Sequence, residues 1–153
     1  MTAAYRSQLS TTINYLLSYV PAFLIRFSCT SRLVGPMTVQ NLSAQAPFIT
    51  KDGSTIRSIL DRTNAPVQNQ SLAEARVAAG ARTERHYHKL AEEFYFILEG
   101  AGEIELDGER RMVGPGDAIL IPPETWHTIL ATEPLRFLCC CAPPYAHADA
   151  YFE

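Results

Sequence analysis

The sequence predicts an all-β domain of the sandwich or barrel type. Short segments rich in β-branched and aromatic residues recur at regular intervals, and Gly, Pro, Asn and Asp separate them. These segments lack the apolar period of 3.6 residues that marks an amphipathic helix. With 153 residues, the chain is long enough for one domain with a substantial core and too short for two of ordinary size.

Residues 1–36 differ in composition from the rest of the chain. They contain no Asp or Glu, are rich in Ser and Thr, and include an apolar run from Tyr15 to Ile25 that Pro21 interrupts. This run is shorter than the ~20 residues that span a bilayer, and the segment lacks an Ala-x-Ala-type cleavage site. We expect a single domain over residues 37–153. The extension before it is either upstream of a natural start at Met37 or a targeting or interface segment.

The first part of the domain predicts a β-hairpin. Phe48–Thr50 and Thr55–Leu60 read as strands, and the turn signal Lys51–Ser54 joins them. Residues Ser71–Ala79 are ambiguous, because their alanines favour a helix while the surrounding pattern is that of strands.

The second part contains the clearest strand signals. Phe94–Leu98 is aromatic and β-branched, and Gly102–Leu106 alternates between apolar and polar residues. Asp107-Gly108 is a two-residue hairpin signal of the primed-turn kind. It leads into a strand over Glu109–Val113. Three further strands are predicted at Ala118–Ile121, His127–Leu130 and Leu135–Ala142.

Three histidines and one glutamate stand where strands can bring them to one point. His86 and His88 are one residue apart, so both side chains leave the same face of a strand. Glu93 opens the next strand, and His127 follows a short strand pattern and a turn marked by Pro122. Three neutral nitrogens and one carboxylate suit one divalent transition metal, namely Fe, Mn, Ni, Cu or Zn.

These residues resemble the first motif of the cupin superfamily. That motif reads Gly, five residues, His-x-His, three or four residues, Glu, six residues, Gly. Its fixed positions are filled by Gly80, His86, His88, Glu93 and Gly100. Glu92 competes for the carboxylate position, but only Glu93 keeps the interval to Gly100.

The second cupin motif is matched with two departures. Gly116, Pro122 and His127 occupy their expected positions, whereas Glu124 replaces a Gly and Ala131 replaces an Asn. Neither departure falls on a ligand position. They therefore bear on the shape of the local turn rather than on the metal site.

The resemblance covers residues from about Ala65 to Cys141. It implies a double-stranded β-helix, a small jelly-roll barrel, and it selects a strand for Ser71–Ala79. It also implies a metal bound by a four-residue set and assembly as a homodimer. The implied ligands are His86, His88, Glu93 and His127.

Alternation along the strand after Glu93 assigns its neighbours to two faces. If Glu93 points inward, Tyr95 does too, while Phe94 and Phe96 form an apolar outer face. We expect another layer of the chain or a second subunit to cover that face. Tyr95 is the candidate for catalytic proton transfer, together with a charged residue from the strand Ser71–Arg76. The alternative for Tyr95 is a core aromatic whose hydroxyl bonds to the backbone.

Three consecutive cysteines occur near the end of the domain. Alternation places Cys139 and Cys141 on one face and Cys140 on the other. They act either as small buried hydrophobes or as redox-active or supplementary soft ligands. A run of free thiols fits a reducing compartment, so a cytoplasmic location is expected.

The predicted function follows from the metal set. The formal net charge of −3 comes without a basic stripe, so we expect neither nucleic acid nor membrane as a partner. We expect a metal-binding protein that acts on a small oxygenated or sulfur-containing molecule, as an oxidoreductase of the oxygenase type or as an isomerase. The alternative is a non-catalytic module that binds or senses a small molecule or a metal.

Overall fold

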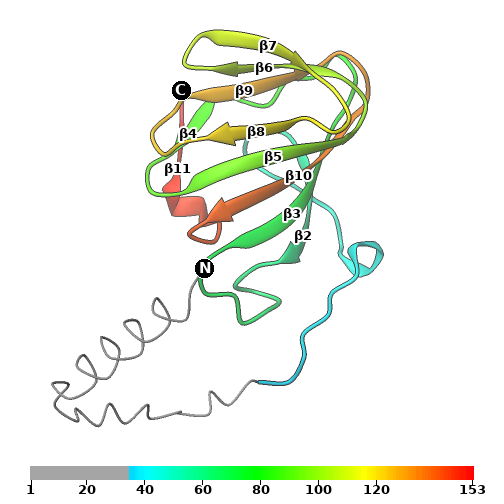
Figure 1. Ribbon diagram of the computed structural model, residues 1–153, viewed down its shortest axis with the longest axis vertical. Helices are drawn as coiled ribbons and strands as arrows, with labels where there is room; N and C mark the ends of the chain where they lie inside the picture. Colours follow the sequence, from blue (N-terminus) through cyan, green and yellow to red (C-terminus); the bar gives the residue numbers. More distant parts are fainter. Residues whose placement is uncertain (1–34) are drawn as a thin grey trace, which may run out of the picture. The chain divides into compact units, whose positions relative to one another are not determined.

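The computed structural model describes residues 35–153, in which Thr38–Glu153 form one compact unit of two antiparallel sheets (Figure 1). The expectations for the N-terminal extension fall almost entirely on residues outside this described range. Within it, no helix is long and apolar enough to cross a membrane.

The two sheets have six and five strands. The six-stranded sheet has the order β1-β2-β3-β10-β5-β8, and the five-stranded sheet has the order β11-β4-β9-β6-β7. The elements are η1 (Leu42–Ala44), β1 (Phe48–Ile49), β2 (Thr55–Leu60), β3 (Ser71–Val77), β4 (His86–His88), β5 (Glu92–Glu99), β6 (Gly102–Leu106), β7 (Glu109–Val113), β8 (Ala118–Ile121), β9 (His127–Ala131), β10 (Leu135–Ala142), η2 (His147–Asp149) and β11 (Ala150–Phe152).

Consecutive strands switch repeatedly between the two sheets, as the jelly-roll prediction requires. Each predicted strand is present, and the ambiguous segment Ser71–Ala79 forms β3. The Asp107-Gly108 turn has positive φ at both residues, 46° and 90°, which is the backbone of the predicted primed hairpin turn. Strand β11 was not predicted, because its short segment carries little strand signal and is stabilised by pairing with β4.

The core lies between the two sheets and consists of the side chains that point inward at alternate positions along the strands. In β5, Glu93, Tyr95 and Ile97 are buried, whereas Phe94 and Phe96 remain 42% and 39% exposed. The predicted division of faces is therefore confirmed. No layer formed by residues 35–153 covers the outer face of β5.

Candidate metal centre

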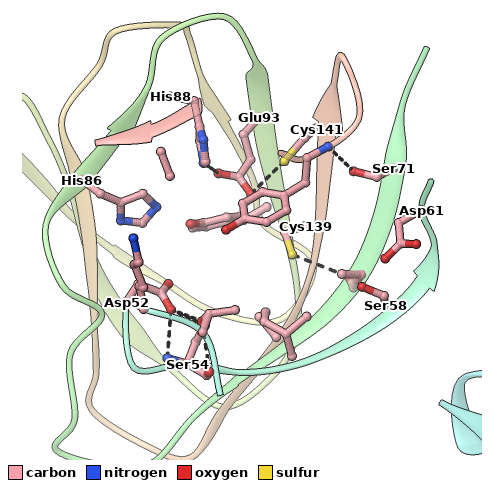
Figure 2. Close-up of a pocket in the computed structure, with 18 of the residues that line it drawn as sticks. Asp52, Ser54, Ser58, Asp61, Ser71, His86, His88, Glu93, Cys139 and Cys141 are labelled. Carbon is pink, nitrogen blue, oxygen red and sulfur yellow. Dashed lines mark hydrogen bonds and ion pairs between the residues drawn. The ribbon is translucent and has the colours of Figure 1, made fainter. Parts of the chain in front are cut away.

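A cavity of about 80 Å³ opens at the inward face of the six-stranded sheet (Figure 2). Its wall combines polar groups from β2, β3 and β5 with the ends of β4 and β11. The turn Thr50–Ser54, which joins β1 to β2, also lines it. In Figure 2, Asp52 and Ser54 lie below the cavity, and His88 and Glu93 lie above it.

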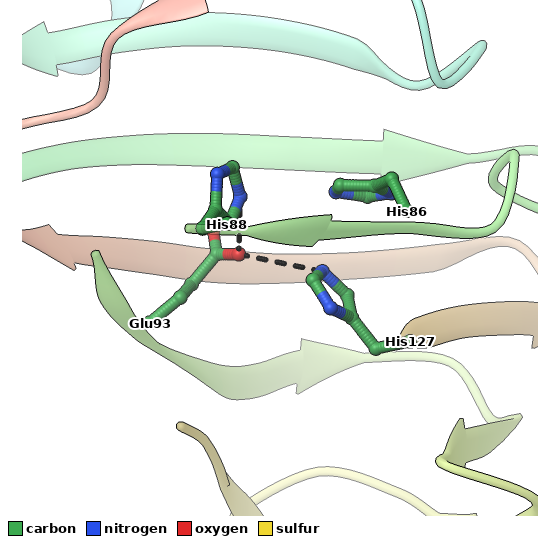
Figure 3. A group of neighbouring side chains, drawn as sticks. All are labelled: His86, His88, Glu93 and His127. Carbon is green, nitrogen blue, oxygen red and sulfur yellow. Dashed lines mark ion pairs between the residues drawn. The ribbon is translucent and has the colours of Figure 1, made fainter. Parts of the chain in front are cut away.

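The four predicted ligand residues form one cluster (Figure 3), of which His86, His88 and Glu93 line this cavity and His127 is fully buried. His86 and His88 come from β4, and Glu93 comes from β5. His127 begins β9 and is paired in register with His86. One ligand atom from each residue lies within 4.8 Å of the others, and all four side chains are buried. The competing carboxylate, Glu92, is exposed.

Backbone carbonyl groups orient two of the imidazoles. Nδ1 of His86 lies 2.8 Å from the carbonyl oxygen of Glu84, and Nδ1 of His127 lies 3.0 Å from that of Thr125. Because a carbonyl oxygen only accepts, each Nδ1 carries the proton and donates. The Nε2 lone pair of each ring is then available to a metal ion, the usual arrangement for a histidine ligand.

Two buried polar atoms in the cluster lack a hydrogen-bond partner among residues 35–153. They are Oε2 of Glu93 and Nε2 of His127, which lie 3.6 Å apart. Oε2 of Glu93 also lies 3.2 Å from Nε2 of His88, an ion-pair contact without hydrogen-bond geometry. Buried polar atoms without partners are costly, so the convergence of two of them at one point fits a site for a bound ion. A divalent ion would satisfy both, and the donor set fits one.

Burial and neighbouring charges set the protonation of this cluster. Burial, together with the neighbouring His86 imidazole, lowers the pKa of His127 to about 4. Burial would raise the pKa of Glu93, but the His88 imidazole outweighs it and keeps that pKa below the ordinary value. Burial would lower the pKa of His88, and the Glu93 carboxylate outweighs it and raises that pKa. Near neutral pH the cluster thus offers a neutral His127 and an ionised Glu93, the forms that bind metals.

Tyr95 lines the same cavity as the ligand residues. Its side chain is buried, and burial together with the negative charge of Glu93 raises the pKa of its hydroxyl well above the ordinary value. At neutral pH it is therefore a neutral phenol that can donate a proton or a hydrogen bond. The charged residues of β3 do not line the cavity, because Ala73 and Ala75 do and alternation sends Glu74 and Arg76 to the opposite face, where they form an ion pair.

The three cysteine side chains lie on two faces of β10, as the alternation along the strand predicted. Cys139 and Cys141 line the cavity and Cys140 does not, and all three thiols are free. Burial raises the pKa of both cavity thiols, so they are protonated. Cys141 donates a hydrogen bond to Oε1 of Glu93 over 3.4 Å, so its thiol contacts a ligand residue rather than joining the cluster itself.

Lys51, Asp52 and Phe152 are among the cavity residues for which the sequence indicated no role in the site. Lys51 and Asp52 were read only as part of a turn, and Phe152 lies in the strand β11 that was not predicted. The Phe152 ring stacks on that of His86, with centroids 5.3 Å apart and planes inclined by 23°. No spacing in the sequence marks these residues, because β11 and the turn reach the cavity only through sheet pairing.

Glu124, which replaces a glycine of the second cupin motif, keeps a backbone conformation typical of glycine. Glu124 has φ of 63°, a left-handed conformation that glycine adopts without strain. Its amide donates a hydrogen bond over 2.7 Å to the carbonyl oxygen of His88. The turn before His127 therefore holds β4 in place even with a non-glycine residue.

Comparisons with known proteins agree with this architecture. A family profile described as "Cupin domain" matches residues 73–141. MJ1618, an uncharacterized protein of Methanocaldococcus jannaschii, is 50% identical over 105 residues, which cover 67% of this chain and 84% of that protein. The dimethylsulfoniopropionate lyase DddW of Ruegeria pomeroyi is 33% identical over 98 residues, which cover 63% of this chain and 60% of the lyase.

A solved structure supports the same fold. A protein from Planctomyces limnophilus superposes with a TM-score of 0.66 at 25% sequence identity. The match covers 78% of this chain and 98% of that one.

Proposed function

The chain belongs to the cupin superfamily, and we propose that it is a metal-dependent enzyme acting on a small oxygenated or sulfur-containing molecule. The observation that carries this proposal is the convergence of Oε2 of Glu93, a residue of the cavity wall, with Nε2 of His127. Both atoms are buried and lack a hydrogen-bond partner among the described residues. Atoms placed in this way are suited to a metal ion that a small molecule can approach.

In this proposal Nε2 of the three imidazoles and Oε2 of Glu93 hold one divalent transition metal. When bound, the ion supplies Lewis-acid polarisation of a donor atom of the substrate. Fe, Mn, Ni, Cu and Zn all suit the donor set. The metal affinity of nearly any such site rises along the same series from Mn to Cu, so affinity does not select one metal. Cellular supply and coordination geometry therefore decide the identity of the metal.

The protein's own groups favour a reaction with proton transfer, such as an isomerisation or an elimination. Tyr95 provides a neutral hydroxyl as the proton donor. Asp52 provides a carboxylate on the wall of the same cavity as the proton acceptor. The lyase DddW is a relative whose name states an elimination-type activity. For this chain, an elimination and an isomerisation are therefore together the first candidate reactions.

An oxygenase is the second candidate, because a histidine and carboxylate set with open positions also suits iron and dioxygen. The non-enzymatic alternative is a module that binds a small molecule without converting it. We further propose that the protein is a homodimer, supported by the exposed apolar face of β5. We also propose that it is cytoplasmic, supported by the free thiols of Cys139, Cys140 and Cys141.

Metal content measured by mass spectrometry tests the proposal. Protein purified without chelator is compared with a His86→Ala/His127→Ala double variant and with His147→Ala, which changes an exposed histidine outside the cluster. We expect near-stoichiometric metal in the parent and in His147→Ala, and none in the double variant, with all three folded by circular dichroism. Absence of metal from the parent even after reconstitution would overturn the metalloenzyme proposal. Metal and ligand binding without product over long incubation would favour the non-catalytic module.

A further inference from the structure

A lysine lies at the edge of the metal cavity without an ionic partner. Lys51 is the only lysine or arginine among the residues that line the cavity. The described arginines Arg57, Arg76 and Arg136 pair with Glu74, whereas Lys51 forms no ion pair within residues 35–153. Residues 1–34 contain no Asp or Glu that could supply one.

The Lys51 ammonium contacts an aromatic ring that also packs against a candidate metal ligand, and Lys51 and that ligand, His86, line the same cavity. Its Nζ lies 5.8 Å from the centroid of the Phe152 ring, a cation–π contact, and that ring in turn stacks on His86. The ammonium and the imidazole of a candidate ligand thus flank one aromatic side chain. A molecule in the cavity can reach both.

Several hydrogen bonds fix the conformation of the turn that carries Lys51. Thr50 N donates to Ser54 O over 3.0 Å, and Gly53, with φ of 84°, closes the turn by donating to Thr50 O over 3.1 Å. Oδ1 of Asp52 accepts hydrogen bonds from the amide and hydroxyl of Ser54 and from the hydroxyl of Thr50.

The same turn is tied to the segment that precedes β4. Glu84 N donates to the carbonyl oxygen of Asp52 over 2.8 Å, and Glu84 O is the acceptor that orients His86. One short backbone path therefore links the position of Lys51 to that of a candidate ligand. This arrangement is suited to recognising a molecule that bridges the two.

We propose that Lys51 and the ion at the metal centre together bind small monocarboxylates that carry a second donor atom, such as 2-hydroxy and 2-oxo acids. The carboxylate pairs with the Lys51 ammonium, and the hydroxyl or oxo oxygen faces the ion. This inference rests on the proposed metal dependence and adds the class of substrate.

The other charges of the cavity restrict the ligand to a single negative charge. Asp52 and Asp61 also line the cavity, and Glu93 belongs to the metal cluster. A second carboxylate on the ligand would be repelled by these groups. A neutral amide would forgo the charge-assisted hydrogen bond to Lys51. The size of the cavity, about 80 Å³, further favours small acids.

Calorimetric binding to metal-loaded protein tests the proposal with lactate, malate and lactamide as probes, which represent a monocarboxylate, a dicarboxylate and a neutral amide. Lys51→Met removes the charge at similar length, and Lys51→Arg keeps it. Lys89→Met is the matched control, because Lys89 is an exposed lysine that does not line the cavity. Metal content and thermal unfolding are measured for every variant.

We expect the parent to bind lactate at least about tenfold more tightly than lactamide or malate, the size of effect that a hydrogen bond to a charged group produces. Lys51→Met should lose the preference for lactate over lactamide at unchanged metal content, while Lys51→Arg and Lys89→Met retain it. Equal binding of lactate by Lys51→Met and the parent would overturn the role of Lys51, as would a parent that binds metal but no 2-hydroxy or 2-oxo acid. A parent without metal would overturn the metal-dependent function itself, which the metal measurement distinguishes from failure at Lys51.

Discussion

The thiol of Cys141 lies 3.4 Å from Oε1 of Glu93, on the neighbouring strand and directly in register with it. Burial keeps this thiol protonated, so it donates to Oε1 and leaves Oε2 facing the imidazoles. A residue outside both sequence motifs therefore sets the orientation of the only carboxylate in the cluster.

Replacing Cys141 by alanine should weaken metal binding without unfolding the protein. Partners that orient a metal ligand are typically worth 10- to 100-fold in metal affinity, and a weak thiol donor belongs at the lower end, about tenfold. Competition titration with a metal-binding dye measures the change. Cys140→Ala removes a thiol that does not line the cavity and should leave the affinity unchanged. Equal affinities for both variants would show that the Cys141 contact has no role in binding.

Removing the metal should lower the melting temperature. A ligand that binds only the folded state stabilises it by about 2.7 kcal/mol when its free concentration is 100 times the Kd. Differential scanning calorimetry before and after chelation measures the loss, which should reverse on adding metal. His127→Ala should show no metal-dependent change, whereas His147→Ala should behave as the parent. A metal-dependent shift that persists in His127→Ala would place the ion elsewhere.

Glu124→Gly should stabilise the domain. Glu124 has φ of 63°, and the left-handed conformation costs a non-glycine residue about 1–2 kcal/mol, part of which the greater freedom of glycine in the unfolded chain offsets. We expect a net gain of about 0.5–1 kcal/mol in the free energy of unfolding, measured with urea. Glu133→Gly changes an exposed glutamate without positive φ and should be destabilising. A destabilising effect of Glu124→Gly as well would show that the left-handed backbone at residue 124 does not cost the folded state free energy.

Glu74→Gln should reduce stability in a pH-dependent way. Glu74 is 1% exposed; burial would raise its pKa, but hydrogen bonds from Arg76 and Arg136 outweigh burial and hold that pKa below the ordinary value of 4.5. The folded state therefore binds fewer protons at this site than the unfolded state, so the stabilisation is complete above pH ~4.5 and is lost as the pH falls through the lowered pKa.

The difference in free energy of unfolding between the parent and Glu74→Gln should be about 2 kcal/mol at pH 7, the scale of hydrogen bonds to charged groups. It should shrink below pH ~4.5 in urea titrations. Glu109→Gln removes an exposed pair with Arg111 and should cost less than about 1 kcal/mol. A difference for Glu74→Gln that does not change with pH would contradict an ionised Glu74.

Phe96→Asp should convert a homodimer into a monomer. Phe94, Phe96 and Leu120 are 42%, 39% and 57% exposed on adjacent strands of one sheet, a patch that a second subunit would cover. Light scattering after size-exclusion chromatography measures the mass. Met112→Asp alters an exposed apolar residue on β7 of the other sheet and should leave the dimer intact. A parent that elutes as a monomer at micromolar concentration would refute the proposed assembly.

Apart from β11, the strands and the faces of β5 could be predicted from the sequence. Alternation is a local property with a period of two, so Glu93 and Tyr95 could be assigned to the cavity and Phe94 to the outside before any contact was known. The spacing of the histidines and Glu93 also indicated a common site, since side chains at alternate positions leave one face of a strand.

The tertiary structure alone decided which other residues share that site. Lys51 and Asp52 reach the cavity because the hairpin turn is bonded to Glu84, and Phe152 reaches His86 because β11 pairs with β4. The bond from Cys141 to Glu93 likewise depends on the register between β10 and β5. These contacts join residues far apart in the chain, and strand order and register set them, so local periodicity carries no information about them.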